Sequence, residues 1–112
     1  MRPVLVLVIV MALAGLGPLA ALAADPPEIA LVIEKNRFQP EEIKVKANVP
    51  FVLVVTNKDG AAEEFESKEL RIEKVIPAGK TLKIRVRALK PGRYPFVGEY
   101  HEKTAKGVIV AE

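Results

Sequence analysis

The sequence predicts an all-β protein that folds as a single antiparallel β-sandwich, and three observations support this fold class. Apolar residues recur at every second position in several short segments, which is the period of a strand with one buried face. Turn residues separate these segments at short intervals, and no stretch keeps a helical period. The chain has 112 residues, a length that accommodates one domain and leaves little room for a second.

The expected strands can be followed along the chain. Apolar and other residues alternate in segments 29–33, 43–47 and 82–86, so one face of each strand should be buried and the other solvated. Residues 51–55 form an uninterrupted β-branched and aromatic run, as expected for a strand at the centre of a sheet. Residues 108–110 end the chain in the same manner.

Turn signals at 57–60, 77–80 and 90–93 separate these strands. The last of them, Lys-Pro-Gly-Arg, has Pro and then Gly at its two central positions, the signature of a type II turn. We therefore expect about seven short strands in one sandwich. The large side chains predicted for its core are Phe38, Phe51, Phe65, Phe96 and Tyr94.

The first 23 residues have the pattern of a secretory signal peptide. Arg2 makes the start positive, residues 4–14 are apolar, and Gly and Pro precede the small residues of Ala21-Leu22-Ala23, which a signal peptidase recognises. An uncleaved membrane anchor is the alternative, because residues 3–24 carry no charge and could almost span a bilayer. The predicted organisation is a signal peptide, residues 1–23, followed by one exported domain, residues 24–112.

Composition excludes several classes of function. The absence of Cys excludes disulfides, Cys-based zinc sites, iron–sulfur clusters and thiol catalysis. The 17 basic and 14 acidic residues are interleaved, which gives little support to nucleic-acid binding. With one His and no phosphate-binding glycine loop, neither a Ser–His–Asp triad nor a nucleotide site is indicated. We therefore expect a binding protein and not an enzyme, with ferroxidase activity left open.

Two acidic segments could carry ligand chemistry. In residues 63–67, Glu64 and Glu66 should share one face of an extended strand while Phe65 takes the other. Paired carboxylates build sites for hard cations, although a solvated strand edge has the same pattern. The second segment, residues 94–102, contains the single histidine, His101, among aromatic and acidic neighbours. Its spacing alone does not distinguish a ligand from a polar loop residue.

Taken together, these segments resemble the cupredoxins, a family of copper-binding β-sandwich proteins. The likeness lies in the Asn-Lys-Asp loop at 57–59 followed by a strand at Phe65, and in a run of Lys-Pro-Gly-x-Tyr-x-Phe-x-Gly-x-x-His at 90–101. The closing Gly-Val-Ile-Val at 107–110 completes it. The resemblance covers essentially the whole exported domain and implies a Greek-key cupredoxin-like sandwich.

The resemblance also implies the positions of the four blue-copper ligands, and only one of them is retained. The first histidine ligand is replaced by Glu63 and the cysteine by Gly98, while His101 is kept. The weak axial methionine falls at Ala105 or Lys106. Because a blue-copper centre needs a thiolate as well as imidazoles, this chain cannot form one.

A closer likeness is to the EfeO-type cupredoxin-like domains, which occur with bacterial iron-uptake permeases. It is carried by Glu-Glu-Phe-Glu-Ser at 63–67 and by Tyr-Pro-Phe-x-Gly-Glu-Tyr-His within 94–101. In that family a Glu-aromatic-Glu element is a proposed metal-binding feature, and it matches residues 64–66 here. The resemblance implies that five residues converge on a metal site at one end of the sandwich: Glu64, Glu66, Glu99, His101 and, as a fifth candidate, Glu63.

The resulting hypothesis is a periplasmic metal-binding protein that supports high-affinity iron uptake. It would bind iron or copper(II) at this Glu/His site, since a carboxylate-rich site without sulfur does not suit Cu(I). The expected partners are an inner-membrane iron permease and a periplasmic iron-binding protein. The alternative is a docking module without metal that binds a membrane permease or another periplasmic partner. The sequence does not distinguish iron from copper(II), or a monomer from a dimer.

Overall fold

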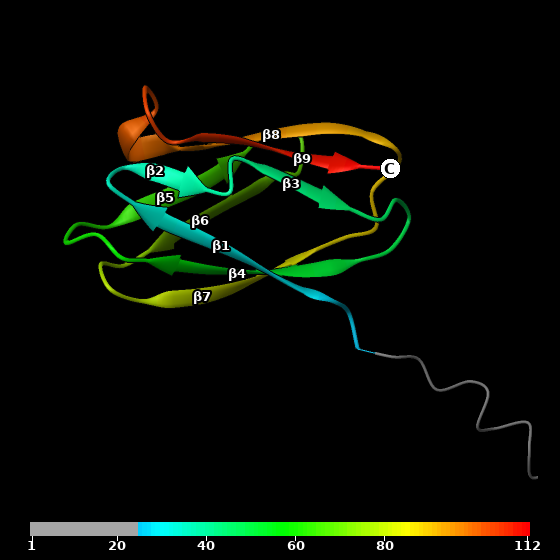
Figure 1. The fold of residues 1–112 in the computed structure, drawn as a ribbon, viewed down its shortest axis with the longest axis horizontal. Coiled ribbons are helices and arrows are strands. Elements are labelled where there is room, and N and C mark those ends of the chain that lie inside the picture. The colour runs from blue at the N-terminus through cyan, green and yellow to red at the C-terminus, as the bar shows by residue number, and fades with distance from the viewer. Residues whose placement is uncertain (1–24) are drawn as a thin grey trace, which may run out of the picture.

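The computed structural model describes residues 25–112, and the predicted signal peptide lies outside the described residues. Two β-sheets pack face to face (Figure 1), which confirms the predicted sandwich. No helix in residues 25–112 is long and apolar enough to cross a membrane. The elements are β1 (Glu28–Glu34), β2 (Arg37–Gln39), β3 (Glu42–Val45), β4 (Phe51–Asn57), β5 (Glu63–Ser67), β6 (Ile72–Ile76), β7 (Thr81–Val86), β8 (Gly92–Gly98), the short 3-10 helix η1 (Glu99–His101) and β9 (Lys106–Ala111).

Both sheets are mixed, which corrects the expectation of a purely antiparallel sandwich. One sheet has the order β2-β1-β4-β7 and the other β3-β9-β8-β5-β6. Within them β1 runs parallel to β4, and β3 runs parallel to β9. In each parallel pair the partners are far apart in the sequence. Alternation of apolar residues predicts which face of a strand is buried, but it does not identify the neighbouring strand.

The turns between strands also differ from expectation at one place. Residues 77–80 form a turn in which the Lys80 amide donates to the Pro77 carbonyl oxygen over 3.1 Å, with Gly79 at a φ of 71°. At 90–93 the predicted type II turn is absent. Gly92 has a φ of 158°, far from the value of about 80° that this turn requires, and it already begins β8.

The core lies between the sheets and contains the predicted phenylalanines, each at most 2% exposed. Three of them form an aromatic cluster. The ring of Phe96 stacks on Phe65 with centroids 5.0 Å apart, and it meets Phe38 edge-to-face at 4.9 Å. Tyr94 is half-buried against this core, and its hydroxyl donates to the Lys90 carbonyl oxygen over 2.7 Å. The cluster supports the end of β8 from which η1 starts.

Asn57 organises the loop between β4 and β5, which lies at the same end of the sandwich as η1 (Figure 1, left). Its side chain is fully buried. The amide nitrogen donates to the carbonyl oxygens of Ala61 and Ile76 over 2.9 and 3.0 Å, and the amide oxygen accepts the Asp59 N–H. The Asn-Lys-Asp motif therefore has a structural role here, because a buried amide with three partners fixes the loop.

The β1–β2 turn joins this loop to the segment that follows η1. The Asp59 carboxylate accepts the backbone N–H groups of Lys35 and Asn36 over 2.7 and 3.0 Å. The Thr104 hydroxyl donates to the Asn36 carbonyl oxygen over 2.6 Å. These bonds hold three loops together at one end of the sandwich, where the predicted ligands lie.

Candidate metal site

The structure divides the five predicted ligands into two groups because of the alternation along β5. Glu63 is 1% exposed and shares the inner face of β5 with Phe65. Glu64 and Glu66 lie half-buried on the outer face. His101 contacts Glu63 and so belongs to the inner group. Glu99 lies with the outer glutamates.

The inner group is a hydrogen-bonded pair. Glu63 Oε2 lies 2.6 Å from His101 Nδ1, and Glu63 Oε1 accepts the N–H groups of Tyr100 and Glu64, each over 2.9 Å. We assign Glu63 as the acceptor of this bond and His101 Nδ1 as its donor, because the other oxygen of the same carboxylate accepts two backbone N–H groups. The His101 side chain is 32% exposed. The nitrogen that it retains for any other partner is therefore Nε2.

The four positions that resemble blue-copper ligands do lie together. A Cβ atom at Gly98 would be 2.7 Å from the Cβ of Ala105 and 2.7 Å from Cδ of Glu63, closer than real contacts allow. Glycine is required at position 98 because the Glu63 carboxylate fills the space that a side chain would take. With no thiolate in the chain and this carboxylate beside His101, the residues do not fit a blue-copper centre.

The outer group is a cluster of four carboxylates, which we name the outer cluster: Glu64, Glu66, Glu73 and Glu99. Each offers an oxygen within 4.8 Å of the others. Glu66 lies directly opposite Glu73 in the β5–β6 pairing, and Glu99 follows Gly98 at the end of β8. Among residues 25–112, no ion pair within 4 Å involves any member of the cluster.

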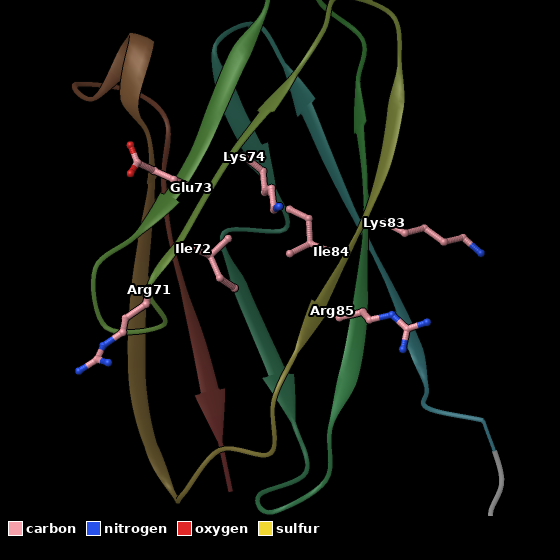
Figure 2. A pocket seen from close by; sticks show the side chains of 7 residues that line it. All are labelled: Arg71, Ile72, Glu73, Lys74, Lys83, Ile84 and Arg85. Carbon is pink, nitrogen blue, oxygen red and sulfur yellow. The ribbon is translucent and has the colours of Figure 1, made fainter.

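Glu73 is the member that sequence reasoning missed. Its strand, β6, is not among the strands predicted from the sequence, because apolar and polar residues do not alternate in Ile-Glu-Lys-Val-Ile. In Figure 2 Ile72 points toward β7, whereas the Glu73 side chain extends from the other face of β6. The signal that would have found Glu73 is a β-hairpin. A turn after Ser67 returns the chain antiparallel to β5 and sets Glu73 opposite Glu66.

Two members of the outer cluster, Glu66 and Glu99, have a raised pKa. Burial raises the pKa of Glu66, and the neighbouring Glu99 raises it further, while Lys68 opposes the shift. The pKa of Glu99 is raised first by hydrogen bonding with Glu64, and burial and the charge of Glu102 add to this, against the opposite effect of Glu66. Carboxylates that repel each other hold protons more tightly, and a bound cation would relieve the same repulsion.

A hollow of about 550 Å³ opens between β6 and β7, the outermost strands of the two sheets at one side of the sandwich. Ile72, Lys74 and Ile84 point into the space between the strands, whereas Lys83 and Arg85 point away from β6 (Figure 2). Basic side chains on edge strands hinder pairing with other chains. Of the lining residues only Glu73 belongs to the outer cluster, and its side chain faces the other way.

Comparison with known proteins agrees with this fold. The family model of the cupredoxin-like domain matches residues 4–111. One curated relative, an uncharacterized protein of Rickettsia prowazekii (strain Madrid E), is 34% identical over 83 residues. The match covers 74% of this chain, and the chain spans 66% of the length of that relative.

Solved structures with the same fold include copper proteins. Auracyanin A, a "blue" copper protein from Chloroflexus aurantiacus, superposes with a TM-score of 0.67 at 12% identity over 79% of this chain and 100% of its own. The metal-binding domain of the Cu(I)-exporting P-type ATPase CopA from Streptococcus pneumoniae, solved with Cu(I), gives 0.68 at 20% identity over 82% and 91%. At such identities the likeness shows the fold alone. With the family model matching nearly its whole length, the chain belongs to the cupredoxin-like domain family.

Proposed function

We propose that this protein is an exported, EfeO-type metal-binding protein that supports high-affinity iron uptake by binding iron or copper(II). The observation that carries the proposal is the outer cluster, in which four carboxylates lie within 4.8 Å of one another. These carboxylates have no ion-pair partner within the described part of the chain. Hard cations prefer oxygen ligands of this kind.

The outer cluster is a better candidate than the inner pair for two reasons. Glu63 already accepts three hydrogen bonds, so a metal ion there would have to displace them. The outer carboxylates are half-buried or exposed and accessible to an ion. We assign the metal to Glu64, Glu66 and Glu99 together with Glu73. His101 is not part of this cluster and is paired with Glu63. Iron and copper(II) suit such a site, and Cu(I) does not.

The cellular setting of the proposal rests on the leader pattern of residues 1–23 and on the resemblance of residues 63–67 and 94–101 to EfeO-type domains. We place the exported domain in the periplasm, where it would pass metal to an inner-membrane iron permease or to a periplasmic iron-binding protein. Its role is binding and transfer. We expect no turnover in a ferroxidase assay with dissolved oxygen, because no open redox site is part of the proposal.

The test is isothermal titration of the chelator-stripped exported domain with Cu(II) and with Mn(II) as an air-stable substitute for Fe(II). The triple variant Glu64→Gln, Glu66→Gln, Glu99→Gln should lose binding with at least one of the ions. A matched triple variant, Glu41→Gln, Glu69→Gln, Glu112→Gln, removes the same charge at exposed positions elsewhere and should bind as the wild type does.

Equal weakening in both triple variants would mean that general negative charge attracts the ion, and the site assignment would then be wrong. No heat with either ion, from wild-type protein that circular dichroism shows to be folded, would refute metal binding. That second outcome would favour the docking module as the function.

A further inference from the structure

We infer that Glu63 is an internal latch, in which one buried carboxylate ties η1 to β5 through hydrogen bonds. By holding the backbone beside Glu64 and Glu99, the latch would also position two members of the outer cluster. The latch itself does not depend on the function proposed above, whereas its effect on metal binding does.

The contacts of Glu63 join β5 to η1, beyond the short stretch in which β5 pairs with β8. Strands β5 and β8 pair at only two positions, Phe65 with Gly98 and Glu66 with Val97, and β8 ends at Gly98. Beyond that point, Glu63 on β5 accepts the Tyr100 N–H and the His101 Nδ1–H, both from η1. The carboxylate therefore continues the connection between these segments after the backbone ladder has ended.

Burial makes this connection strong. Glu63 is 1% exposed, so water does not compete well for its oxygens, and hydrogen bonds to an ionised acceptor are stronger than neutral ones. The space around it is filled, because even one added carbon at Gly98 would collide with Glu63 and Ala105. The Glu63 side chain thus holds the segment that carries His101 against β5, with no ion required.

The same carboxylate oxygen contacts the backbone beside two outer carboxylates. Glu63 Oε1 accepts the N–H of Glu64, and it accepts the N–H of Tyr100, which directly follows Glu99. Glu64 and Glu99 come from different elements, so their relative position depends on how η1 is held against β5. Groups that fix the geometry of metal ligands affect affinity without touching the metal.

Amide hydrogen exchange of the chelator-stripped protein tests the latch without any metal. In Glu63→Ala the protection of the Tyr100 amide should fall about tenfold or more, because its acceptor is removed. Glu63→Gln should keep most of the protection, since its amide oxygen can still accept. The control is Val86→Ala, which truncates a buried residue paired with Phe51 in the other sheet. It should leave the protection of the Tyr100 amide unchanged. Unchanged protection in Glu63→Ala would overturn the latch.

Glu63→Gln decides the question if Glu63→Ala does not fold. In this variant the side-chain amide oxygen should accept the backbone N–H groups of Glu64 and Tyr100. The side-chain NH₂ group should then face His101 and donate to Nδ1. The imidazole proton should then move from Nδ1 to Nε2, and the ¹⁵N shifts of the two ring nitrogens should exchange. Identical imidazole ¹⁵N shifts in the wild type and in Glu63→Gln would contradict a hydrogen bond donated by His101 Nδ1 to Glu63.

Titration with Mn(II) tests the positioning role. Glu63→Ala should bind Mn(II) about 10- to 100-fold more weakly than the wild type, while Glu63→Gln should recover most of the affinity. If the wild type binds Mn(II) and Glu63→Ala binds it equally well, the positioning role is wrong. If the wild type binds no Mn(II), the same titration is made with Cu(II). If it binds neither ion, the proposed function fails, and the exchange experiment still decides whether Glu63 is a latch.

Discussion

Glu63 and Glu64 are neighbours in the sequence, yet β5 places them in opposite environments. Glu63 is 1% exposed and holds three hydrogen-bond donors, whereas Glu64 lies half-buried among three other carboxylates without an ion pair in the described chain. The cause is the two-residue period of a strand, which turns successive side chains to opposite faces. Two glutamates can therefore have opposite effects on stability. Glu63 stabilises the fold as a hydrogen-bond acceptor, whereas Glu64 adds to a group of like charges that repel each other.

Loss of the hydrogen bonds between Glu63 and its partners should destabilise the protein most. Glu63→Ala should lower the free energy of unfolding by about 3 kcal/mol, because it leaves His101 and a buried backbone N–H without their acceptor. Glu64→Ala, one residue away on the outer face, should change stability by no more than about 0.5 kcal/mol. Urea unfolding followed by circular dichroism measures both. Similar losses in the two variants would contradict the contrast between the faces.

A smaller effect is expected where the inner pair limits space. Gly98→Ala adds a Cβ that would lie 2.7 Å from both Ala105 and Glu63, and overpacking of this kind costs about 1–3 kcal/mol. Gly60→Ala is the control, because a Cβ there meets nothing within 4 Å. Adding Glu63→Ala should reduce the cost of Gly98→Ala, since one of the two colliding groups is gone. Strictly additive costs in urea unfolding would indicate that Glu63 does not fill this space.

The smallest effect should come from the outer cluster. A pKa that is raised in the folded protein, as for Glu66, means that the folded state holds its proton more tightly than the unfolded chain. Its contribution to stability is therefore present at acidic pH and is lost as pH rises through the raised pKa. Glu66→Gln removes this loss, so its melting temperature should exceed that of the wild type near neutral pH and not at about pH 4.

Added salt should shrink the difference between Glu66→Gln and the wild type, because exposed charges are screened. Glu41→Gln, an exposed residue outside the cluster, provides the matched control across the same pH range. A constant difference between Glu66→Gln and wild type at all pH values would mean that the ionisation of Glu66 is not its source.

Much of the fold could be predicted from the sequence because it depends on local periodicity. Alternation identified the strands with one buried face, and it placed Phe65 inside with Glu64 and Glu66 outside. The same alternation puts Glu63 on the inner side with Phe65. Periodicity does not identify the partner of this buried carboxylate, since His101 lies 38 positions away. The family resemblance brought the two residues to one site, but as metal ligands and not as a hydrogen-bonded pair.

Strand pairing explains the other differences. Strand β6 lacks the alternation that sequence reasoning depends on, so Glu73 joined the outer cluster only through its register with Glu66. The parallel pairs of β1 with β4 and of β3 with β9 likewise join segments between which no local pattern exists. Register and partner are set by how the faces of whole strands pack.

The all-β class, the phenylalanine core, the lack of any thiolate ligand and the resemblance of residues 90–101 to a cupredoxin loop are all readable in the amino-acid sequence. These properties follow from residue types and short-range spacing. The hydrogen bond between Glu63 and His101 and the gathering of four other carboxylates on the outer face arise from the packing of the folded chain. Both depend on contacts between segments far apart in the chain, and such contacts exist only once the two sheets have packed.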